Sequence, residues 1–283
     1  MTTIKVRQPP FDFSDVSPQW SPNLEIAHGM NASGIIPAYI EPYLIKVMRK
    51  AKAELDPLQH SGLLADIDAF IRQEAQHYKF HASLNKMIRD GGYERMAEFE
   101  AAYAADYERF LATKPLSWHL AYCEGFEALG SASAGFMLSG DFDDQFGDAD
   151  RRPIDLWKWH LAEEYEHRNV VFQTYKAICG GQPIRAWLRR VRGFLFCARH
   201  LFGHTSKLKS YLIDVDRARM SPAEVELSKR RVSNASRKEA LRRLPGVLKI
   251  LSPFYDPAAL PPPTQLESVL ARYSSAITAG DDR

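Results

Sequence analysis

A glutamate and two histidines recur at helical spacing in the first third of the chain: Glu74, His77 and His81. Residues three or four apart lie on one face of an α-helix, so these three side chains point the same way. Ile67 and Phe70 extend this face with apolar bulk, which indicates that it looks into the core. A carboxylate and an imidazole one turn apart can bind a common metal ion from one rigid element.

A second segment repeats the pattern with His160, Glu164 and His167 on one face. Trp157 extends that face with an apolar ring, whereas Glu163 lies about 100° further round the helix and is a less natural ligand. In di-iron and di-manganese bundles, two helices each supply a Glu-x-x-His motif and two further helices each supply one Glu. The two segments therefore predict half of a dinuclear metal site.

Two further core carboxylates are needed, and three candidates lie in apolar surroundings. Glu124 and Glu127 are one turn apart in an apolar helix, and we expect Glu124 to be the ligand, with Glu127 as second choice. Glu41 is the only acid in the apolar part of the first helix. Because Pro42 follows it, we expect Glu41 near the helix N-terminus.

The predicted ligands are thus Glu41, Glu74, His77, Glu124, Glu164 and His167. Mixed carboxylate and imidazole ligands suit iron and manganese, and also zinc. We expect two ions and favour iron. His81 and His160 are expected to orient the metal ligands through hydrogen bonds or to relay protons. Two alternatives are open: they could contact the substrate, or they could be core histidines with a purely structural role.

The elements that carry these residues are predicted to be long helices separated by short breakers such as Asp90-Gly91-Gly92. This order predicts an all-α fold, a ferritin-like four-helix bundle with additional C-terminal helices. The expected parts are an irregular N-terminal arm over 1–36, a di-metal bundle over 37–181, a basic helical region over 182–278 that packs on the bundle, and a disordered tail over 279–283. Within the basic region we expect helices over 184–213 and 222–243, then a Pro-rich stretch over 244–263.

Composition fits a globular protein: 45% of the 283 residues are hydrophobic and 25% are charged. The sequence has no stretch of about 18–20 apolar residues for a membrane span and no apolar segment of a secretory signal. Three scattered cysteines argue against a disulfide framework, so we expect a cytoplasmic protein. The acidic run 141–152 lacks the glycine and glutamate positions of a calcium loop, and phosphate-loop and nucleophile-elbow motifs are missing.

Basic residues concentrate in 184–250, which contains 17 Lys and Arg but only five Asp and Glu. The whole chain, by contrast, has a formal net charge of only +2. We favour a helix that covers the bundle and solvates its arginines. The alternatives are contact with an anionic membrane surface or docking of an acidic electron donor. Without a base-reading motif, we expect no binding of nucleic acid.

The segments assembled above resemble the ferritin-like bacterial family of predicted metal-dependent hydrolases. The most specific part is 159–167, and the resemblance extends over 37–44, 70–77, the Glu124 helix and 156–175, with a looser match at 252–257. It implies a four-helix metal core with the six ligands named above. Glu41 lies one residue later than the family's Pro-x-Gly-Glu pattern, and Tyr255 stands where many relatives have His.

The leading functional hypothesis is a di-iron oxidoreductase that activates O₂ to hydroxylate or desaturate a small apolar substrate. Its electrons would come from an external donor, since flavin and nicotinamide motifs are missing. The alternatives are a dinuclear zinc or manganese hydrolase, in which the metals activate water, and a non-catalytic ferritin-like metal-binding protein. The sequence leaves the substrate, the metal and the oligomeric state open.

Overall fold

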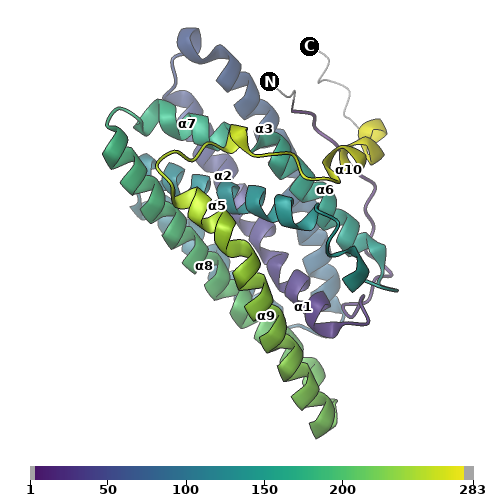
Figure 1. Cartoon of the computed structure of the whole chain (residues 1–283). Helices are drawn as coiled ribbons and strands as arrows, with labels where there is room; N and C mark the ends of the chain where they lie inside the picture. The colour runs from purple at the N-terminus through teal and green to yellow at the C-terminus, as the bar shows by residue number, and fades with distance from the viewer. Residues whose placement is uncertain (1–3, 277–283) are drawn as a thin grey trace.

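A computed structural model describes residues 4–276, except for the side chains of 235–241 and 243. In this part of the chain, ten α-helices and three short 3-10 helices follow one another without a β-strand (Figure 1). The all-α prediction is therefore confirmed. The predicted tail over 279–283 lies outside the described residues.

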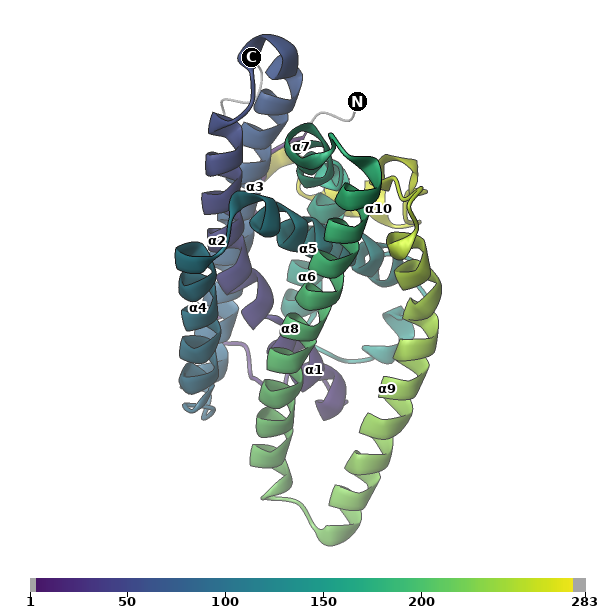
Figure 2. The ribbon, with the colours of Figure 1, turned by 90° about the vertical axis from the view of Figure 1, so that its left-hand side faces the viewer.

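Four helices surround the chain's most polar interior. They are α2 (Ile35–Ala53), α3 (Pro57–Asp90), α5 (Leu116–Met137) and α6 (Arg151–His167). α2 packs along α3, α3 contacts α6, α6 packs on α5, and α5 closes the ring against α2 (Figures 1 and 2). The helical pattern of the sequence predicts one continuous helix from Pro153 to Gly180, but the structure divides it, because α7 (Val170–Cys179) begins after a break at residues 168–169.

Side chains at the helix starts explain where two of these helices begin. Asp56 accepts a hydrogen bond from the Leu58 backbone N–H, and Pro57 takes the first helical position. Asp150 accepts in the same way from the Arg152 N–H at the start of α6. Such caps satisfy backbone donors that have no partner within the helix, which stabilises each start by about 1 kcal/mol.

The N-terminal region differs from the irregular arm predicted for 1–36. The chain forms α1 (Leu24–Ser33), which Asn23 caps, and α2 begins directly afterwards at Ile35. α2 also continues through Pro42, although proline removes one helical hydrogen bond. Glu41 therefore lies in the second turn of α2, fully buried, rather than at a helix start.

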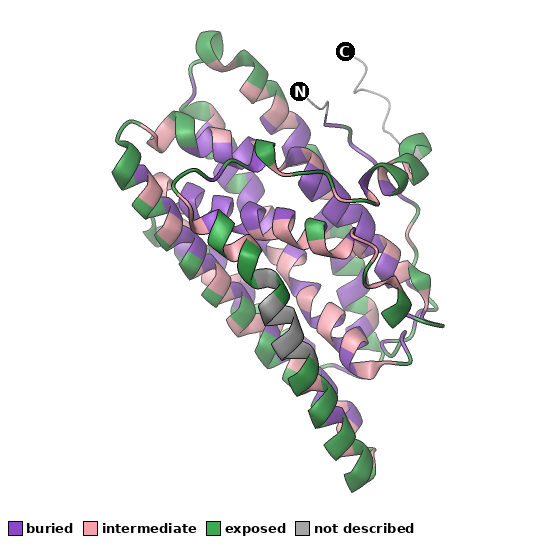
Figure 3. Ribbon diagram, in the orientation of Figure 1, coloured by how far each residue is buried: buried purple, intermediate pink, exposed green. Residues whose placement is uncertain are grey.

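The basic region forms a long helical hairpin of α8 (Pro183–Arg217) and α9 (Pro222–Leu251). α9 runs past Pro245, so the Pro-rich stretch predicted from residue 244 begins later than expected. α8 lies close against α5: a Cβ atom on Gly193 would stand 2.4 Å from the Ala121 carbonyl oxygen. Only glycine permits this approach. The far end of the hairpin projects beyond the bundle (Figure 2), and Figure 3 shows it largely exposed.

Two further helices cover the outside of the ring. α4 (Met96–Thr113) packs on α2 and α8, and α10 (Leu266–Arg272) packs on α6. The segment before α1 is extended and inserts Phe13 and Trp20 into the core. Among residues 4–276, no helix combines the length and apolar character that crossing a membrane requires.

Candidate metal centre

Seven buried side chains form two adjoining groups inside the ring of four helices. Site A consists of Glu41, His77, His160 and Glu164, and site B consists of Glu74, Glu127, Glu164 and His167. Within each site, one potential ligand atom from every residue lies within 4.8 Å of the others. All seven residues are at most 2% exposed. We call the two sites together the dinuclear centre.

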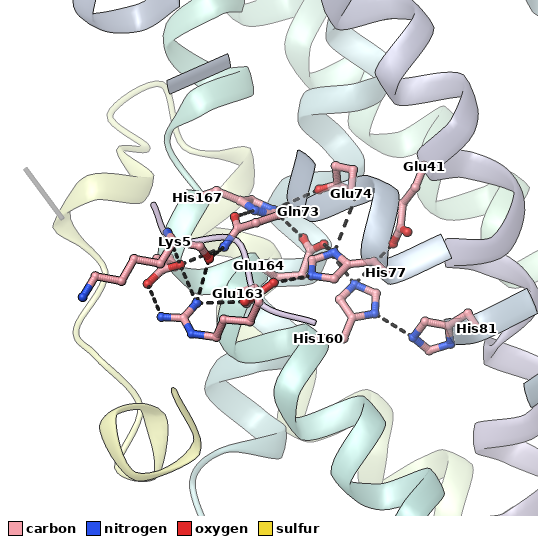
Figure 4. A network of polar contacts seen from close by, with 12 residues as sticks. Lys5, Glu41, Gln73, Glu74, His77, His81, His160, Glu163, Glu164 and His167 are labelled. Atoms are coloured by element: carbon pink, nitrogen blue, oxygen red, sulfur yellow. Dashed lines mark hydrogen bonds and ion pairs between the residues drawn. The ribbon is translucent and has the colours of Figure 1, made fainter. Parts of the chain in front are cut away.

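Glu164 belongs to both sites because its two carboxylate oxygens face different ways (Figure 4). Its Oε1 lies 3.0 Å from His160 Nε2 and 3.7 Å from His77 Nδ1, both in site A. Its Oε2 lies 3.5 Å from His167 Nε2 in site B. One oxygen of Glu164 is therefore available to each of the two sites.

Glu74 has a similar double orientation. Its Oε1 lies 3.2 Å from His167 Nε2, and its Oε2 lies 3.9 Å from His77 Nδ1. Glu41 and Glu127 instead lie at opposite ends: Glu41 Oε1 is 3.3 Å from His160 Nε2, whereas Glu127 Oε2 is 3.3 Å from His167 Nε2. Two central and two terminal carboxylates therefore line the dinuclear centre.

A glycine on α5 makes room for the central carboxylate. A Cβ atom on Gly130 would lie 2.6 Å from Glu164 Oε2 and 3.3 Å from its carboxyl carbon. Both distances are shorter than ordinary van der Waals contact. Any side chain at residue 130 would therefore require the Glu164 carboxylate to move.

The donor atoms of the centre fit a bound cation. Among the described residues, many of these buried atoms have no hydrogen-bond partner: both oxygens of Glu41, Glu74 and Glu127, Glu164 Oε2, His77 Nδ1 and His167 Nε2. Burying a polar atom without a partner costs about 1–3 kcal/mol, and more for a charged group. Metal ions would satisfy these atoms together, and a carboxylate–imidazole set suits iron, manganese or zinc.

Each histidine is also held through its second ring nitrogen. His77 Nε2 donates to Glu163 Oε2 at 3.0 Å, and His167 Nδ1 donates to Gln73 Oε1 at 2.8 Å. His160 Nδ1 shares a 2.8 Å hydrogen bond with His81 Nε2. Such partners fix the ring orientation of metal-binding histidines. In all three rings the remaining nitrogen faces the dinuclear centre.

The N-terminal segment completes this supporting shell. Arg7 Nη1 lies 2.8 Å from Glu163 Oε1 and 3.0 Å from Glu166 Oε2, with only 4% of Arg7 exposed. Gln73 Nε2 donates to Glu166 Oε2 at 2.8 Å and to the Lys5 carbonyl at 2.9 Å. The Arg7 guanidinium thus contacts the His77 partner Glu163 directly and the His167 partner Gln73 through Glu166.

Burial and mutual repulsion raise the pKa values of three of the carboxylates. Burial raises the pKa of Glu41 well above its usual value, and the neighbouring charges of Glu74 and Glu164 add to the rise. Burial and the charge of Glu164 likewise raise the pKa values of Glu127 and Glu74. The environment of the centre therefore favours the protonated form of these three carboxyls more than water does.

Glu164, the carboxylate shared by both sites, behaves in the opposite way. Burial would raise the pKa of Glu164, but the charge of His167 and the hydrogen bond from His160 outweigh it and hold the pKa below its usual range. Burial lowers the pKa of His160 to about 4, helped by the charge of His77. His77 is itself buried, yet its contacts with Glu163 and Glu74 raise its pKa to about 9.

The structure brings five of the six predicted ligands together: Glu41, Glu74, His77, Glu164 and His167. Glu124 lies elsewhere. Its Oε1 is 3.3 Å from Arg190 Nη1, and Arg190 also donates to the carbonyls of Ile250 and Ser252 at the end of α9. Glu127, the second choice, occupies site B instead. Glu124 therefore joins α5 to the α8–α9 hairpin.

The two histidines expected behind the ligands differ in place. His160 contributes a donor atom to site A, whereas His81 lies behind it, in contact with its other nitrogen. The sequence interpretation also missed the supporting residues Arg7, Gln73, Glu163 and Glu166. Glu163 and Gln73 directly precede the candidate ligands Glu164 and Glu74 in sequence, a signal that could have identified them, but nothing local marks Arg7.

The fold and these two sites define an all-α protein with carboxylate–histidine groups that could bind metal ions. A profile of the family of predicted metal-dependent hydrolases matches residues 5–260. This range covers most of the chain, and the protein belongs to that family. No curated protein and no solved structure matches the chain.

Proposed function

We propose that the protein is a dinuclear metal-dependent hydrolase. Glu164 carries this proposal, because its two oxygens face two separate sets of ligand atoms. In our assignment Glu41, His77, His160 and Glu164 would hold the ion of site A, and Glu74, Glu127, Glu164 and His167 would hold the ion of site B. The family description supports hydrolysis as the reaction class and metal dependence as its condition.

Two divalent ions, when bound, would make a coordinated water acidic and polarise a carbonyl or phosphoryl oxygen. The chain's own part is to hold the ligands in place. Glu163 and Gln73 keep one nitrogen of His77 and of His167 directed at the centre. Arg7 in turn fixes Glu163 and, through Glu166, Gln73. The buried surroundings keep bulk water away and strengthen every charge interaction.

A pocket of about 180 Å³ beside α5 is our candidate for the substrate. Its lining is mostly apolar and includes Ala128 and Ile250. Ser131, one helical turn after Glu127, and Tyr255 also line it, and the side-chain hydroxyls of both lack a hydrogen-bond partner among the described residues. We propose a small, largely apolar substrate with a polar group that these hydroxyls could bind.

The second candidate function is the di-iron oxidoreductase expected from the sequence. One observation favours it: four carboxylates and three imidazoles from four helices form a donor set like that of O₂-activating di-iron bundles. An external electron donor would then be required, and the basic α8–α9 hairpin is its candidate docking surface.

Hydrolysis without oxygen separates the two candidates. Metal-free protein would be loaded anaerobically with manganese, zinc or ferrous iron and tested on a panel of small carboxylic and phosphoric esters. We expect turnover that Glu164→Gln abolishes and that Glu98→Gln, an exposed control on α4, leaves unchanged. If no loaded form hydrolyses any ester, while the iron form consumes O₂ with a reductant, the oxidoreductase replaces the hydrolase.

A further inference from the structure

A third group of potential metal ligands lies between α4 and α8, and none of its residues belongs to the dinuclear centre. Asp106 Oδ2 on α4 lies 3.1 Å from His200 Nε2 and 3.0 Å from His204 Nε2. The two histidines are one turn apart on α8, so both rings reach the same point. One potential ligand atom from each of the three residues lies within 4.8 Å of the others.

The orientation of His200 is fixed from behind. Its Nδ1 lies 2.7 Å from the hydroxyl of Tyr122 on α5, which in turn lies 3.1 Å from the Tyr107 hydroxyl. A ring held at one nitrogen presents the other in a set direction, as in protein metal sites. The ring of His204 packs against Tyr103, with 4.7 Å between centroids. Both imidazoles are therefore positioned before any ligand arrives.

We propose that Asp106, His200 and His204 form a separate mononuclear site for a divalent transition-metal ion, with zinc as the first candidate. Two imidazoles and one carboxylate are a common zinc donor set, and water completes the tetrahedron. The side chains of Asp106 and His204 are each 19% exposed, so water and the ion can reach them. A metal ion here would join α4 to α8 on the outside of the four-helix ring.

The charges around the group act in both directions. Asp106 supplies a negative charge between the two imidazoles. Arg109 acts against the cation, because its guanidinium lies 2.6 Å from Asp106 Oδ1. It occupies only that oxygen, whereas Oδ2 faces the histidines.

The plain alternative is a hydrogen-bonded trio in which both histidines donate to Asp106 Oδ2. Metal binding distinguishes the two. Zinc would be titrated into the metal-free full-length chain by calorimetry, and bound zinc would be counted after dialysis. We expect His204→Ala and Asp106→Asn to bind one zinc fewer per chain than the unaltered protein. Lys207→Ala, an exposed change on the same helix, should bind as much as the unaltered protein.

Arg109→Ala gives a test of opposite sign. Removing this cation should tighten zinc binding at the Asp106 group several-fold, because it lowers the repulsion on the metal ion. Equal zinc content in the unaltered protein and in His204→Ala would overturn the proposal, as would an affinity unchanged by Arg109→Ala. The differences in zinc binding between these variants do not depend on the dinuclear centre. The proposed zinc site would therefore stand even if the proposed hydrolase function failed.

Discussion

Replacing Gly130 by alanine is the most informative single change in the dinuclear centre. The new methyl group would stand 2.6 Å from Glu164 Oε2, whereas ordinary contact begins at 3.4 Å. The carboxylate oxygen must therefore move by about 0.8 Å, the difference between the two distances. α5 cannot easily retreat instead, since α8 packs against its other side with a glycine at the contact.

A displacement of this size exceeds the roughly 0.2 Å tolerance of metal–ligand distances. We expect metal affinity to fall about 10–100-fold, as it does when the partners of metal ligands are disturbed, which corresponds to about 1.4–2.7 kcal/mol. The metal-free protein should respond in the opposite direction. Alanine in a helix interior is more favourable than glycine by about 0.5–1 kcal/mol. The free energy of unfolding of the metal-free Gly130→Ala protein should therefore not fall by as much as its metal-binding free energy does.

Gly135→Ala is the matched control on the same helix. A Cβ atom there meets nothing within 4 Å, so this change should add helix stability and leave metal affinity unaltered. The assay is a manganese or zinc titration of all three proteins, combined with urea unfolding of the metal-free forms. If Gly130→Ala binds both ions as tightly as Gly135→Ala does, the bridging role of Glu164 is refuted.

Three further predictions follow from the same geometry. Arg7→Met should weaken metal binding about 10-fold, because Glu163 and Glu166 lose the cation that positions them; unchanged affinity would mean that the N-terminal segment does not support the centre. Glu127→Gln should bind one metal ion fewer, which elemental analysis would show. Glu124→Gln should keep both ions but lower the thermal stability, because it breaks the ion pair with Arg190. Because the pKa values of Glu41, Glu74 and Glu127 are raised in the metal-free centre, metal binding should release protons and tighten as pH rises. Calorimetry in buffers of different ionisation enthalpy measures this release, and a metal affinity that does not change with pH would contradict the raised pKa values.

Helical spacing predicted the Glu-x-x-His residues well, because one turn of a regular helix fixes which side chains share a face. Glu124 and Glu127 could not be separated in this way, since they lie one turn apart on one apolar helix. The choice depends on Arg190, which lies 66 residues further along the chain and pairs with Glu124. Such a contact exists only once α8 has packed on α5.

The N-terminal region shows a second limit of sequence reasoning. Pro42 suggested a helix start, but α2 begins seven residues earlier, at Ile35. The helix tolerates the loss of one backbone hydrogen bond at Pro42 because it lies in a well-packed core. Arg7 carries no local signal, because its role arises from where the extended segment crosses α3 and α6. Composition and spacing thus identified most of the donor set, whereas the supporting contacts depend on tertiary packing.

The most direct test of the central claim is anomalous diffraction from crystals of the manganese-loaded protein. Two manganese peaks about 3.5–4 Å apart, as in known dinuclear sites, should lie between Glu74 and Glu164, with one oxygen of Glu164 directed at each. A single peak, or two peaks that share no carboxylate, would contradict the dinuclear centre.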